Sequence, residues 1–587
     1  MPEAPLPAAP LPEAPLPDAR PAISVGAAVA RLLESHGVQA AFGVISIHNM
    51  PMLDAIATRG QLRFVMARGE AGAANMADAY ARTAGALGVC ITSTGTGAGN
   101  AAGALVEALT AGTPLLHLTG QIELPYLDRQ MAYIHEAPDQ LAMLKAVSKA
   151  AFRVRCAATA VGTVKQAIQC AMTAPRGPVS VEIPIDIQST LIPAPSDWAP
   201  LPVSVTVPSP AALDALAATL ARARRPLLWL GGGARHAGPA LQRLVQLGFG
   251  VVTSTQGRGV LAEGHPRSLG AFNQAPPVEA FYQSCDALLV VGSRLRGNET
   301  LKYQLKLPQP LLRIDADPGA DGRGHANAQF VCGDAALALA GLADRLEAHV
   351  AQHGPLPIAP GFGDDLAGAR RAAEAATADS LGPYAGLLQG LQARVGDRFQ
   401  WVRDVTLSNS MWGNRAPRLA GPLLGVHALG GGIGQGLAMA IGAAVQAACR
   451  SPGVKTWCLA GDGGFVLNLG ELATAVQERC DLTVLLMNDQ AYGVIKNIQD
   501  AQYGGRKVYA DLHTPDYALL AAAIGIGHCR VRDQAGLEAA LDQAAAAPAS
   551  AGPRIIEVDM LAFGAFKTAF AGPPVKPGHA LPAPPAA

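Results

Sequence analysis

Two acidic residues follow neighbouring apolar runs in the C-terminal third of the chain. Asp462 comes after the run at 454–460, and Asp489, 27 positions later, follows the run at 482–487. The two runs predict buried strands, and residues 465–478 between them are expected to form a helix. Both strands of such a βαβ unit end at one edge of a parallel sheet. We therefore expect the two carboxylates to converge on one cation, Mg²⁺ or Ca²⁺.

Glycines surround the first of these acids, in Gly461-Asp462-Gly463-Gly464. They allow the backbone to approach a phosphate closely, and the start of the following helix offers free N–H groups and a positive dipole end. A Gly-Asp-Gly sequence alone is typical of an ordinary strand-to-helix turn. The second strand, with Asn488 before Asp489 at its end, favours a metal and diphosphate site instead.

This spacing resembles the thiamine diphosphate motif, and further segments resemble acetolactate synthases in the same order along the chain. The segment RGEAGAANMADAYAR at 68–82 is similar to the pattern around the glutamate that contacts the aminopyrimidine ring of the cofactor, which places Glu70 in that role. Similar turns, strands and helix starts lie at 94–100, 119–121, 177–188 and 429–444. Since the matches run from residue 22 to about 565, the chain is identified as a member of that superfamily.

The resemblance implies an α/β protein with three doubly wound parallel-sheet domains. A Pro-rich linker at 192–210 and a loose stretch at 351–378 are expected to separate them. The expected units are a disordered Pro/Ala-rich arm at 1–21, a thiamine diphosphate pyrimidine-binding domain at 22–192, a central Rossmann-like domain at 211–350, a diphosphate- and Mg-binding domain at 379–565, and a flexible tail at 566–587.

In the family, the cofactor is activated by three protein groups, and the resemblance assigns each to a residue. Glu70 would be buried and share a proton with N1′ of the aminopyrimidine, which favours the imino form of the ring. Ile433 would be the apolar wedge that bends the cofactor, and the Gly431 carbonyl would accept from its 4′-amino group. The alternatives are an exposed acid at a helix start for Glu70 and simple turn flexibility for Gly431.

At the diphosphate end, the resemblance implies that Asp462 and Asp489 bind Mg²⁺ together with a backbone carbonyl near Ala491. Asp489 departs from the family's usual Asn; a second carboxylate adds negative charge but also strengthens the hold on a divalent cation. Ser408 and Asn409 stand where the family places polar side chains on the phosphates. Equally, they could cap a helix that begins there.

The loop at 43–51 is expected to face the thiazolium ring. Ile47 stands where relatives use Gly, Ser or Asp. Because its side chain is apolar, neighbouring polar residues would have to contact the substrate. His48 is the best proton shuttle because its ordinary pKa lies near neutrality, although a lone histidine in a loop is more often structural. Gln121 and the pair at 135–136, His-Glu, are the other candidates.

Three departures argue against a true acetolactate synthase. Ile185 replaces a lysine, Ile498 stands near a specificity tryptophan, and the family's Phe-Gln-Glu has become Ile-His-Glu at 134–136. The substrate is therefore left open. The expected reaction is C–C bond cleavage of a 2-oxo acid or related carbonyl donor, as a decarboxylase, lyase or carboligase. Alternatives are hydrolytic or CoA-linked C–C cleavage and a catalytically silent homologue.

Composition agrees with a large enzyme. Lys and Arg (45) balance Asp and Glu (45) with no basic stripe, so a nucleic-acid partner is not expected. No apolar stretch reaches the length of a membrane span, and the start of the chain lacks the pattern of a signal peptide. The nine cysteines form no CxxC pair, which predicts a reducing cytoplasm.

The resemblance also implies an assembly: a homodimer or a dimer of dimers, that is, a homotetramer. Glu70 of one subunit would act on a cofactor whose diphosphate is held by Asp462 of the other, while the central domain keeps the two cofactor-binding domains of one chain apart. The glycine-rich turns of the central domain resemble the loops that contact FAD in this group. Such turns also persist without a flavin, so FAD is not assigned.

Overall fold

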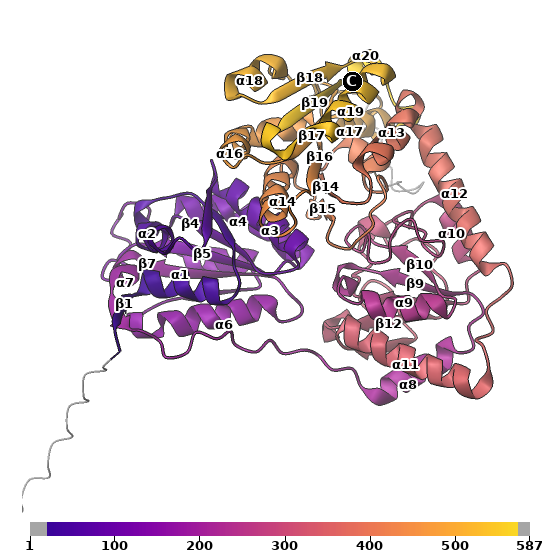
Figure 1. Ribbon diagram of the computed structural model, residues 1–587, viewed down its shortest axis with the longest axis horizontal. Coiled ribbons are helices and arrows are strands. Elements are labelled where there is room, and N and C mark those ends of the chain that lie inside the picture. Colours follow the sequence, from indigo (N-terminus) through magenta and orange to yellow (C-terminus); the bar gives the residue numbers. More distant parts are fainter. Residues whose placement is uncertain (1–19, 573–587) are drawn as a thin grey trace, which may run out of the picture.

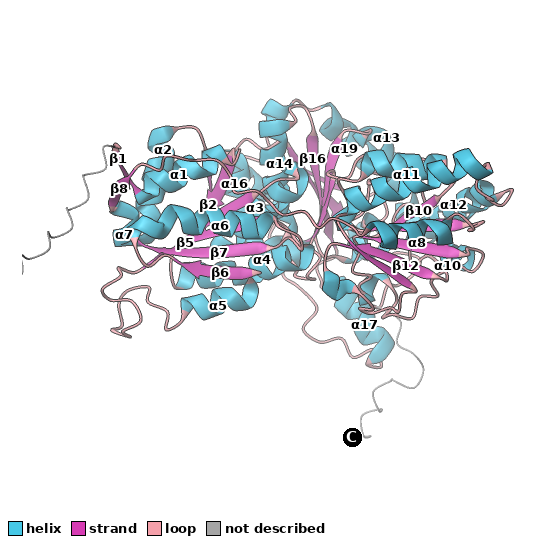
Figure 2. Ribbon diagram, turned by 90° about the horizontal axis from the view of Figure 1, so that it is seen from below, coloured by secondary structure: helices cyan, strands magenta, loops and turns pink. Residues whose placement is uncertain are grey.

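The protein is described by a computed structural model that places residues 20–572. The predicted N-terminal arm and C-terminal tail therefore lie mainly outside the described residues. Three domains are seen in Figure 1, each built on its own parallel sheet, and Figure 2 shows helices packed on both faces of the sheets. The predicted fold class is confirmed.

The first domain carries a six-stranded sheet in the order β3-β2-β4-β5-β7-β6. A short antiparallel pair, β1 (Ala22–Ser24) with β8 (Leu191–Pro193), joins the first and last residues of this domain. The sheet strands are β2 (Ala40–Gly43), β3 (Arg63–Met66), β4 (Gly88–Thr92), β5 (Leu115–Gln121), β6 (Ala150–Arg153) and β7 (Pro178–Pro184). The helices are α1 (Val25–Ser35), α2 (Met50–Arg59), α3 (Glu70–Ala84), α4 (Thr96–Ala111), α5 (Gln140–Val147), α6 (Ala160–Met172) and α7 (Ile185–Ser189).

The central domain has a five-stranded sheet in the order β10-β9-β11-β12-β13. Its strands are β9 (Pro226–Leu230), β10 (Gly250–Thr253), β11 (Ala287–Val291), β12 (Leu311–Asp315) and β13 (Gln329–Cys332). Its helices are α8 (Pro210–Leu220), α9 (Gly238–Gln246), α10 (Pro276–Tyr282) and α11 (Ala335–His353). The middle strands are buried throughout, which explains their unbroken apolar sequences.

The third domain has a six-stranded sheet in the order β15-β14-β16-β17-β19-β18. Its strands are β14 (Phe399–Arg403), β15 (Gly425–His427), β16 (Lys455–Gly461), β17 (Leu482–Asn488), β18 (Gly527–Val531) and β19 (Arg554–Asp559). Its helices are α13 (Ala385–Val395), α14 (Gly436–Arg450), α15 (Asp462–Phe465), α16 (Glu471–Gln477), α17 (Gly493–Gln502), α18 (Tyr517–Ile524), α19 (Gln534–Ala546) and α20 (Met560–Phe563).

Two local expectations are wrong. The stretch at 351–378 is not loose, because α12 (Phe362–Leu381) occupies most of it and joins the central and third domains along one side of the molecule (Figure 1). The helix expected at 465–478 is interrupted: α15 ends at Phe465, and a short 3₁₀ turn precedes α16. Glycine at 470 lowers helix propensity at this break, and Glu471, the first residue of α16, contacts the first domain.

The first and third domains of one chain are in direct contact, contrary to the expectation that the central domain holds them apart. Helices α3 and α14 pack along each other, side by side in Figure 1. A Cβ on Gly442 would lie 2.0 Å from the Met76 carbonyl oxygen, so glycine is needed for this approach. On α16, Glu471 Oε1 accepts from the backbone N–H groups of Arg68 and Gly69, both at 3.1 Å.

Among residues 20–572, no helix combines the length and the apolar character needed to cross a membrane.

Candidate active site

Asp462 and Asp489 meet at the carboxyl edge of the third sheet, as the spacing predicted. Asp462 begins α15 directly after β16, and Asp489 follows β17, the strand paired with β16. Burial and the neighbouring Asp489 carboxylate raise the pKa of Asp462 to about 7, and Asp462 Oδ2 is buried without a hydrogen-bond partner. A divalent cation between the two carboxylates would remove this repulsion and satisfy the free oxygen.

Ser408 and Asn409 lie at the same edge and are almost completely buried. Ser408 Oγ and Asn409 Oδ1 have no hydrogen-bond partner, and neither side chain caps the π-helical turn at Asn409–Gly413. Because unpaired buried polar atoms are costly, this geometry favours the phosphate-binding interpretation over the capping one. The free Ser408 hydroxyl can donate to a diphosphate, whereas Asn409 would donate through Nδ2, because its free Oδ1 only accepts.

The backbone around this edge is closely packed. A Cβ on Gly463 would lie 2.7 Å from the Tyr492 ring. Ala491, whose carbonyl is the expected third metal ligand, is buried and follows Gln490, which adopts a left-handed φ of 54°. The described residues contain no cluster of three or more His, Cys, Asp or Glu side chains that suits a metal. A cation here would need oxygen atoms from the phosphates or from backbone in addition to the two carboxylates.

The glycine-rich loop before α14 carries the predicted wedge. Gly431 has a φ of 83° and Gly434 a φ of 82°, values that favour glycine. Ile433 between them is 40% exposed, so its apolar side chain projects from the protein rather than packing into it. This orientation fits a side chain that would support a bound cofactor.

Asp404 holds this loop in place and was missed by the sequence reasoning. It follows β14, and its Oδ1 accepts from the N–H groups of Gly434 at 3.0 Å and Val405 at 2.7 Å. Burial raises the pKa of Asp404 to about 7, against the lowering effect of these backbone donors. Its position directly after an apolar strand is the same signal that identified Asp462.

Glu107 is a second missed residue, and it fixes the other end of the loop from the first domain. This buried side chain on α4 accepts from the N–H groups of Leu429 at 2.7 Å and of Gly430. It also accepts from Arg82 at 2.7 Å, and Arg82 donates to the His427 carbonyl at 2.7 Å. The sequence did contain a signal for Glu107, an acidic residue within the apolar run at 104–109. A buried acid is costly unless it is paired, so its presence there indicates bonded partners.

Glu70 begins α3 at the carboxyl edge of the first sheet. Its Oε2 accepts from Asn100 Nδ2 at 3.1 Å, and a Cβ on Gly97 would lie 3.0 Å from Oε1. The residue is only partly buried in the single chain, so full burial is not achieved within one subunit. Among residues 20–572, no hydrogen bond or ion pair joins Glu70 to the Asp462–Asp489 pair.

His48 lies close to Glu70 through a chain of contacts. It is 3% exposed, and its ring centroid is 5.1 Å from that of His135. The His135 backbone in turn packs on Gly95, at the turn that also carries Gly97. Burial and His135 lower the pKa of His48, while Glu123 acts in the opposite direction. The Nδ1 atoms of both rings are buried without a partner.

Gln121 is buried, and its amide is occupied within the protein. Its Oε1 accepts from Thr94 Oγ1 at 3.0 Å and Ile122 N at 2.8 Å, and its Nε2 donates to Glu182 at 3.2 Å. These bonds anchor the turn at 94–97. The structure therefore gives Gln121 a positioning contact.

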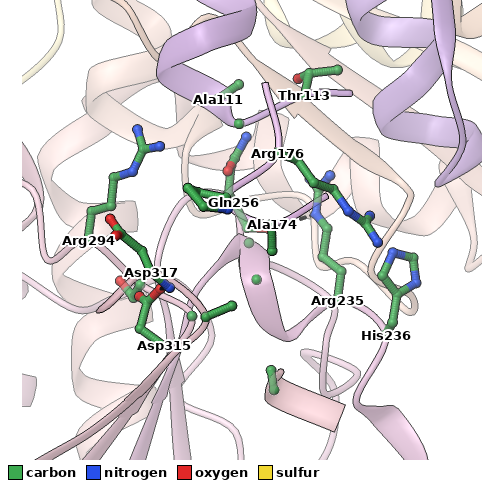
Figure 3. Close-up of a pocket in the computed structure, with 18 of the residues that line it drawn as sticks. Ala111, Thr113, Ala174, Arg176, Arg235, His236, Gln256, Arg294, Asp315 and Asp317 are labelled. Atoms are coloured by element: carbon green, nitrogen blue, oxygen red, sulfur yellow. Dashed lines mark hydrogen bonds between the residues drawn. The ribbon is translucent and has the colours of Figure 1, made fainter. Parts of the chain in front are cut away.

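A separate cavity of about 270 Å³ lies at the carboxyl edge of the central sheet (Figure 3). Arg176 and Arg235 lie beside His236. The pKa of His236 is lowered mainly by burial and further by the positive charges of these two arginines. Arg294 faces them across the view and donates to the Thr110 carbonyl at 2.9 Å. In doubly wound sheets this edge is the usual place for a nucleotide. FAD is not assigned to this cavity.

Comparison with known proteins agrees with the geometry of both half-sites. Three models match: the N-terminal thiamine pyrophosphate (TPP) binding domain of thiamine pyrophosphate enzymes at 23–143, their central domain at 213–342, and their C-terminal TPP binding domain at 408–558. The chain belongs to the thiamine pyrophosphate enzyme family. It is therefore a thiamine diphosphate-dependent enzyme, which confirms the expected thiamine diphosphate.

The relatives of this thiamine pyrophosphate enzyme cover most of its length. A Pseudomonas aeruginosa protein named "Probable 2-ketoarginine decarboxylase" is 32% identical over 528 residues, 88% of this chain and 90% of the relative. The acetolactate synthase isozyme 1 large subunit of Escherichia coli is 28% identical over 553 residues, 90% of this chain and 92% of the relative. The isozyme 2 large subunit of the same organism is 29% identical over 530 residues, 88% and 92% respectively.

Proposed function

We propose that this enzyme uses thiamine diphosphate and Mg²⁺ to cleave the C–C bond next to the carbonyl of a 2-oxo acid, and either protonates or ligates the product. The observation that carries the proposal is that Asp462 Oδ2 and Ser408 Oγ, at the same edge of the third sheet, are both buried without a hydrogen-bond partner. Relatives named for a 2-ketoarginine decarboxylase and for acetolactate synthases support a 2-oxo acid as donor.

The residues divide the work between the two ends of the cofactor. Asp462 and Asp489 would hold Mg²⁺, with the Ala491 carbonyl as a third ligand, and Ser408 and Asn409 would donate to the phosphates. Thiamine diphosphate supplies a carbon nucleophile that adds to the substrate carbonyl.

At the other end, Glu70 would hold a proton at N1′ of the aminopyrimidine, and the Gly431 carbonyl would orient its amino group. Ile433 would support the bent conformation. His48 would move a proton at the substrate, and its buried Nδ1 without a hydrogen-bond partner supports this role.

The proposal includes a homodimer or a dimer of dimers in which Glu70 of one subunit completes the site of the other. Both half-sites expose apolar side chains in the single chain: Ile47 is 61% exposed and Met50 47% in the first domain, and Ile433 is 40% and Leu467 53% in the third. Covering these side chains with a second copy would remove apolar surface from water and exclude water from the cofactor.

A screen of 2-oxo acid donors, each alone and with carbonyl acceptors, tests the reaction. Products are identified by mass spectrometry, with Glu70→Gln as the inactive control. Release of CO₂ with an aldehyde product supports a decarboxylase, and a longer hydroxyketone or hydroxy acid supports a carboligase. Acid products for which water or CoA is the second reactant would favour hydrolytic or CoA-linked C–C cleavage. Cofactor binding without any turnover would favour a silent homologue. Flavin absorbance of the purified protein decides whether FAD is bound.

A further inference from the structure

Glu123 lies at the substrate end of the first-domain half-site with one oxygen unused. It follows β5 by two residues, at the same sheet edge as Glu70. Its Oε1 accepts from the Tyr133 hydroxyl at 3.1 Å, and its Oε2 is buried with no hydrogen-bond partner. A buried carboxylate oxygen without a donor is expensive, so a donor from outside the chain would be strongly favoured.

The Glu123 carboxylate accepts from Tyr133, one of two stacked aromatic rings. Tyr126 and Tyr133 stack with ring centroids 4.9 Å apart, and Tyr126 is 39% exposed. Within residues 20–572, no Lys or Arg side chain forms an ion pair with Glu123. A carboxylate beside accessible aromatic faces is the combination that binds a planar guanidinium, which donates in a fork and stacks on rings.

The position of Glu123 relative to Glu70 suits the far end of a substrate. Glu70 and His135 contact the same turn at Gly97 and Gly95, and the His135 ring contacts His48. Glu123 accepts from Tyr133, two positions before His135 in the same loop, and its charge acts to raise the pKa of His48. Contacts through His135 therefore connect Glu123 and His48 to the turn that Glu70 also contacts.

We propose that Glu123 is the specificity-determining residue of this site and binds a guanidinium group at the far end of the 2-oxo acid side chain, with the exposed ring of Tyr126 stacking on it. This inference rests on the proposed function and adds the substrate class to it. The loop that carries both tyrosines is fixed by Glu136, whose Oε2 accepts from Tyr133 N at 3.0 Å. The ring pair is thus held in place before the substrate arrives.

The test compares three donors with the holoenzyme: 5-guanidino-2-oxopentanoate, the neutral 2-oxohexanoate and the anionic 2-oxoadipate. Wild type is expected to prefer the guanidino acid. In Glu123→Gln, kcat/KM for the guanidino acid should fall by about 10- to 100-fold, as expected for loss of a hydrogen bond to a charged group, and mainly through KM. The value for 2-oxohexanoate should stay within about threefold.

Two further variants provide a matched control and a charge reversal. Asp128→Asn removes the same charge from the same loop, but Asp128 pairs with Arg153 at 2.8 Å and should leave the preference unchanged. Glu123→Lys should shift the preference toward 2-oxoadipate, because the charge that selects the substrate is reversed. The assignment would be overturned if kcat/KM of Glu123→Gln fell equally for the guanidino acid and for 2-oxohexanoate. A wild-type preference for 2-oxohexanoate would also overturn it.

A binding measurement separates this inference from the proposed reaction. Calorimetric titration of the holoenzyme with 5-guanidinopentanoate, which lacks the keto group, should show binding that weakens about tenfold or more in Glu123→Gln. If that dependence is seen while no 2-oxo acid is turned over, the guanidinium site stands and the proposed reaction fails. If 2-oxo acids are turned over but the analogue binds both proteins equally, the reaction stands and the guanidinium site fails.

Discussion

At the scale of single residues, Glu70 carries the most direct prediction. Glu70→Gln keeps the shape and the contact with Asn100 but cannot hold an ionisable proton at the aminopyrimidine. We expect kcat to fall by about 10²-fold or more while calorimetry shows nearly unchanged thiamine diphosphate affinity. Full activity of this variant would remove Glu70 from the mechanism. Glu70→Ala is less informative, because lost packing would mimic lost chemistry.

Asp462→Ala is expected to release both Mg²⁺ and thiamine diphosphate. Without a cation between them, the diphosphate and the Asp489 carboxylate repel each other. The affinity for thiamine diphosphate should therefore fall on the order of 100-fold. Asp481→Ala is the matched control, since Asp481 lies at the opposite end of β17 and pairs with Lys455 at 3.4 Å. EDTA should inactivate the wild type and Mg²⁺ restore it. Cofactor binding that equals wild type in Asp462→Ala would contradict the metal site.

At the scale of elements, the loop before α14 depends on a buried acid at the end of β14. The pKa of Asp404 in the folded protein is about 7, well above its ordinary value near 4. The folded state therefore binds this proton more tightly than the unfolded state, so its contribution to stability is present at low pH and is lost as pH rises toward 7.

Asp404→Asn removes this titration, which gives a pH-dependent prediction for the protein without cofactor. The melting temperature of the variant, relative to wild type, should rise between about pH 5 and about pH 8, because only the wild type must bury a charge at the higher pH. Thermal unfolding followed by circular dichroism at both pH values measures the difference. A difference that is the same at both values would mean that Asp404 is ionised throughout.

Glu107 connects α4 of the first domain to the same loop. Glu107→Gln keeps the size of the side chain but weakens the acceptor for the N–H groups of Leu429 and Gly430 and for Arg82. We expect thiamine diphosphate affinity to fall by about tenfold, since charge-assisted bonds are stronger than neutral ones. Calorimetric titration checks this. Unchanged affinity together with a lower melting temperature would show that Glu107 stabilises the domain contact without affecting the cofactor loop.

At the scale of the whole molecule, the two half-sites must meet across subunits if the proposed homodimer is correct. Co-expression of Glu70→Gln and Asp462→Ala chains tests this, because a mixed dimer has one site with both changes and one intact site. Random pairing of equal amounts should restore up to about a quarter of wild-type activity. If mixed dimers are confirmed by mass spectrometry and remain inactive, each chain completes its own site.

The sequence by itself determined the features that depend on short-range geometry. Asp462 and Asp489 could be predicted as neighbours because a right-handed βαβ unit brings the ends of its two strands to one edge. The place of Glu70 followed from its motif at the start of α3, and the unbroken apolar runs predicted the parallel sheets. Each of these inferences needed only the period of a strand or helix and a connection of ordinary length.

Only the tertiary structure decided how the cofactor loop is held and what each polar side chain touches. Asp404 reaches Gly434 across 30 positions, and Glu107 reaches Leu429 across 322. Gln121 was predicted as a candidate polar group at the thiazolium, and its amide also bonds to Thr94, Ile122 and Glu182. Periodicity gives the face on which a side chain lies but not its partners, because those partners arrive from other elements once the domains pack.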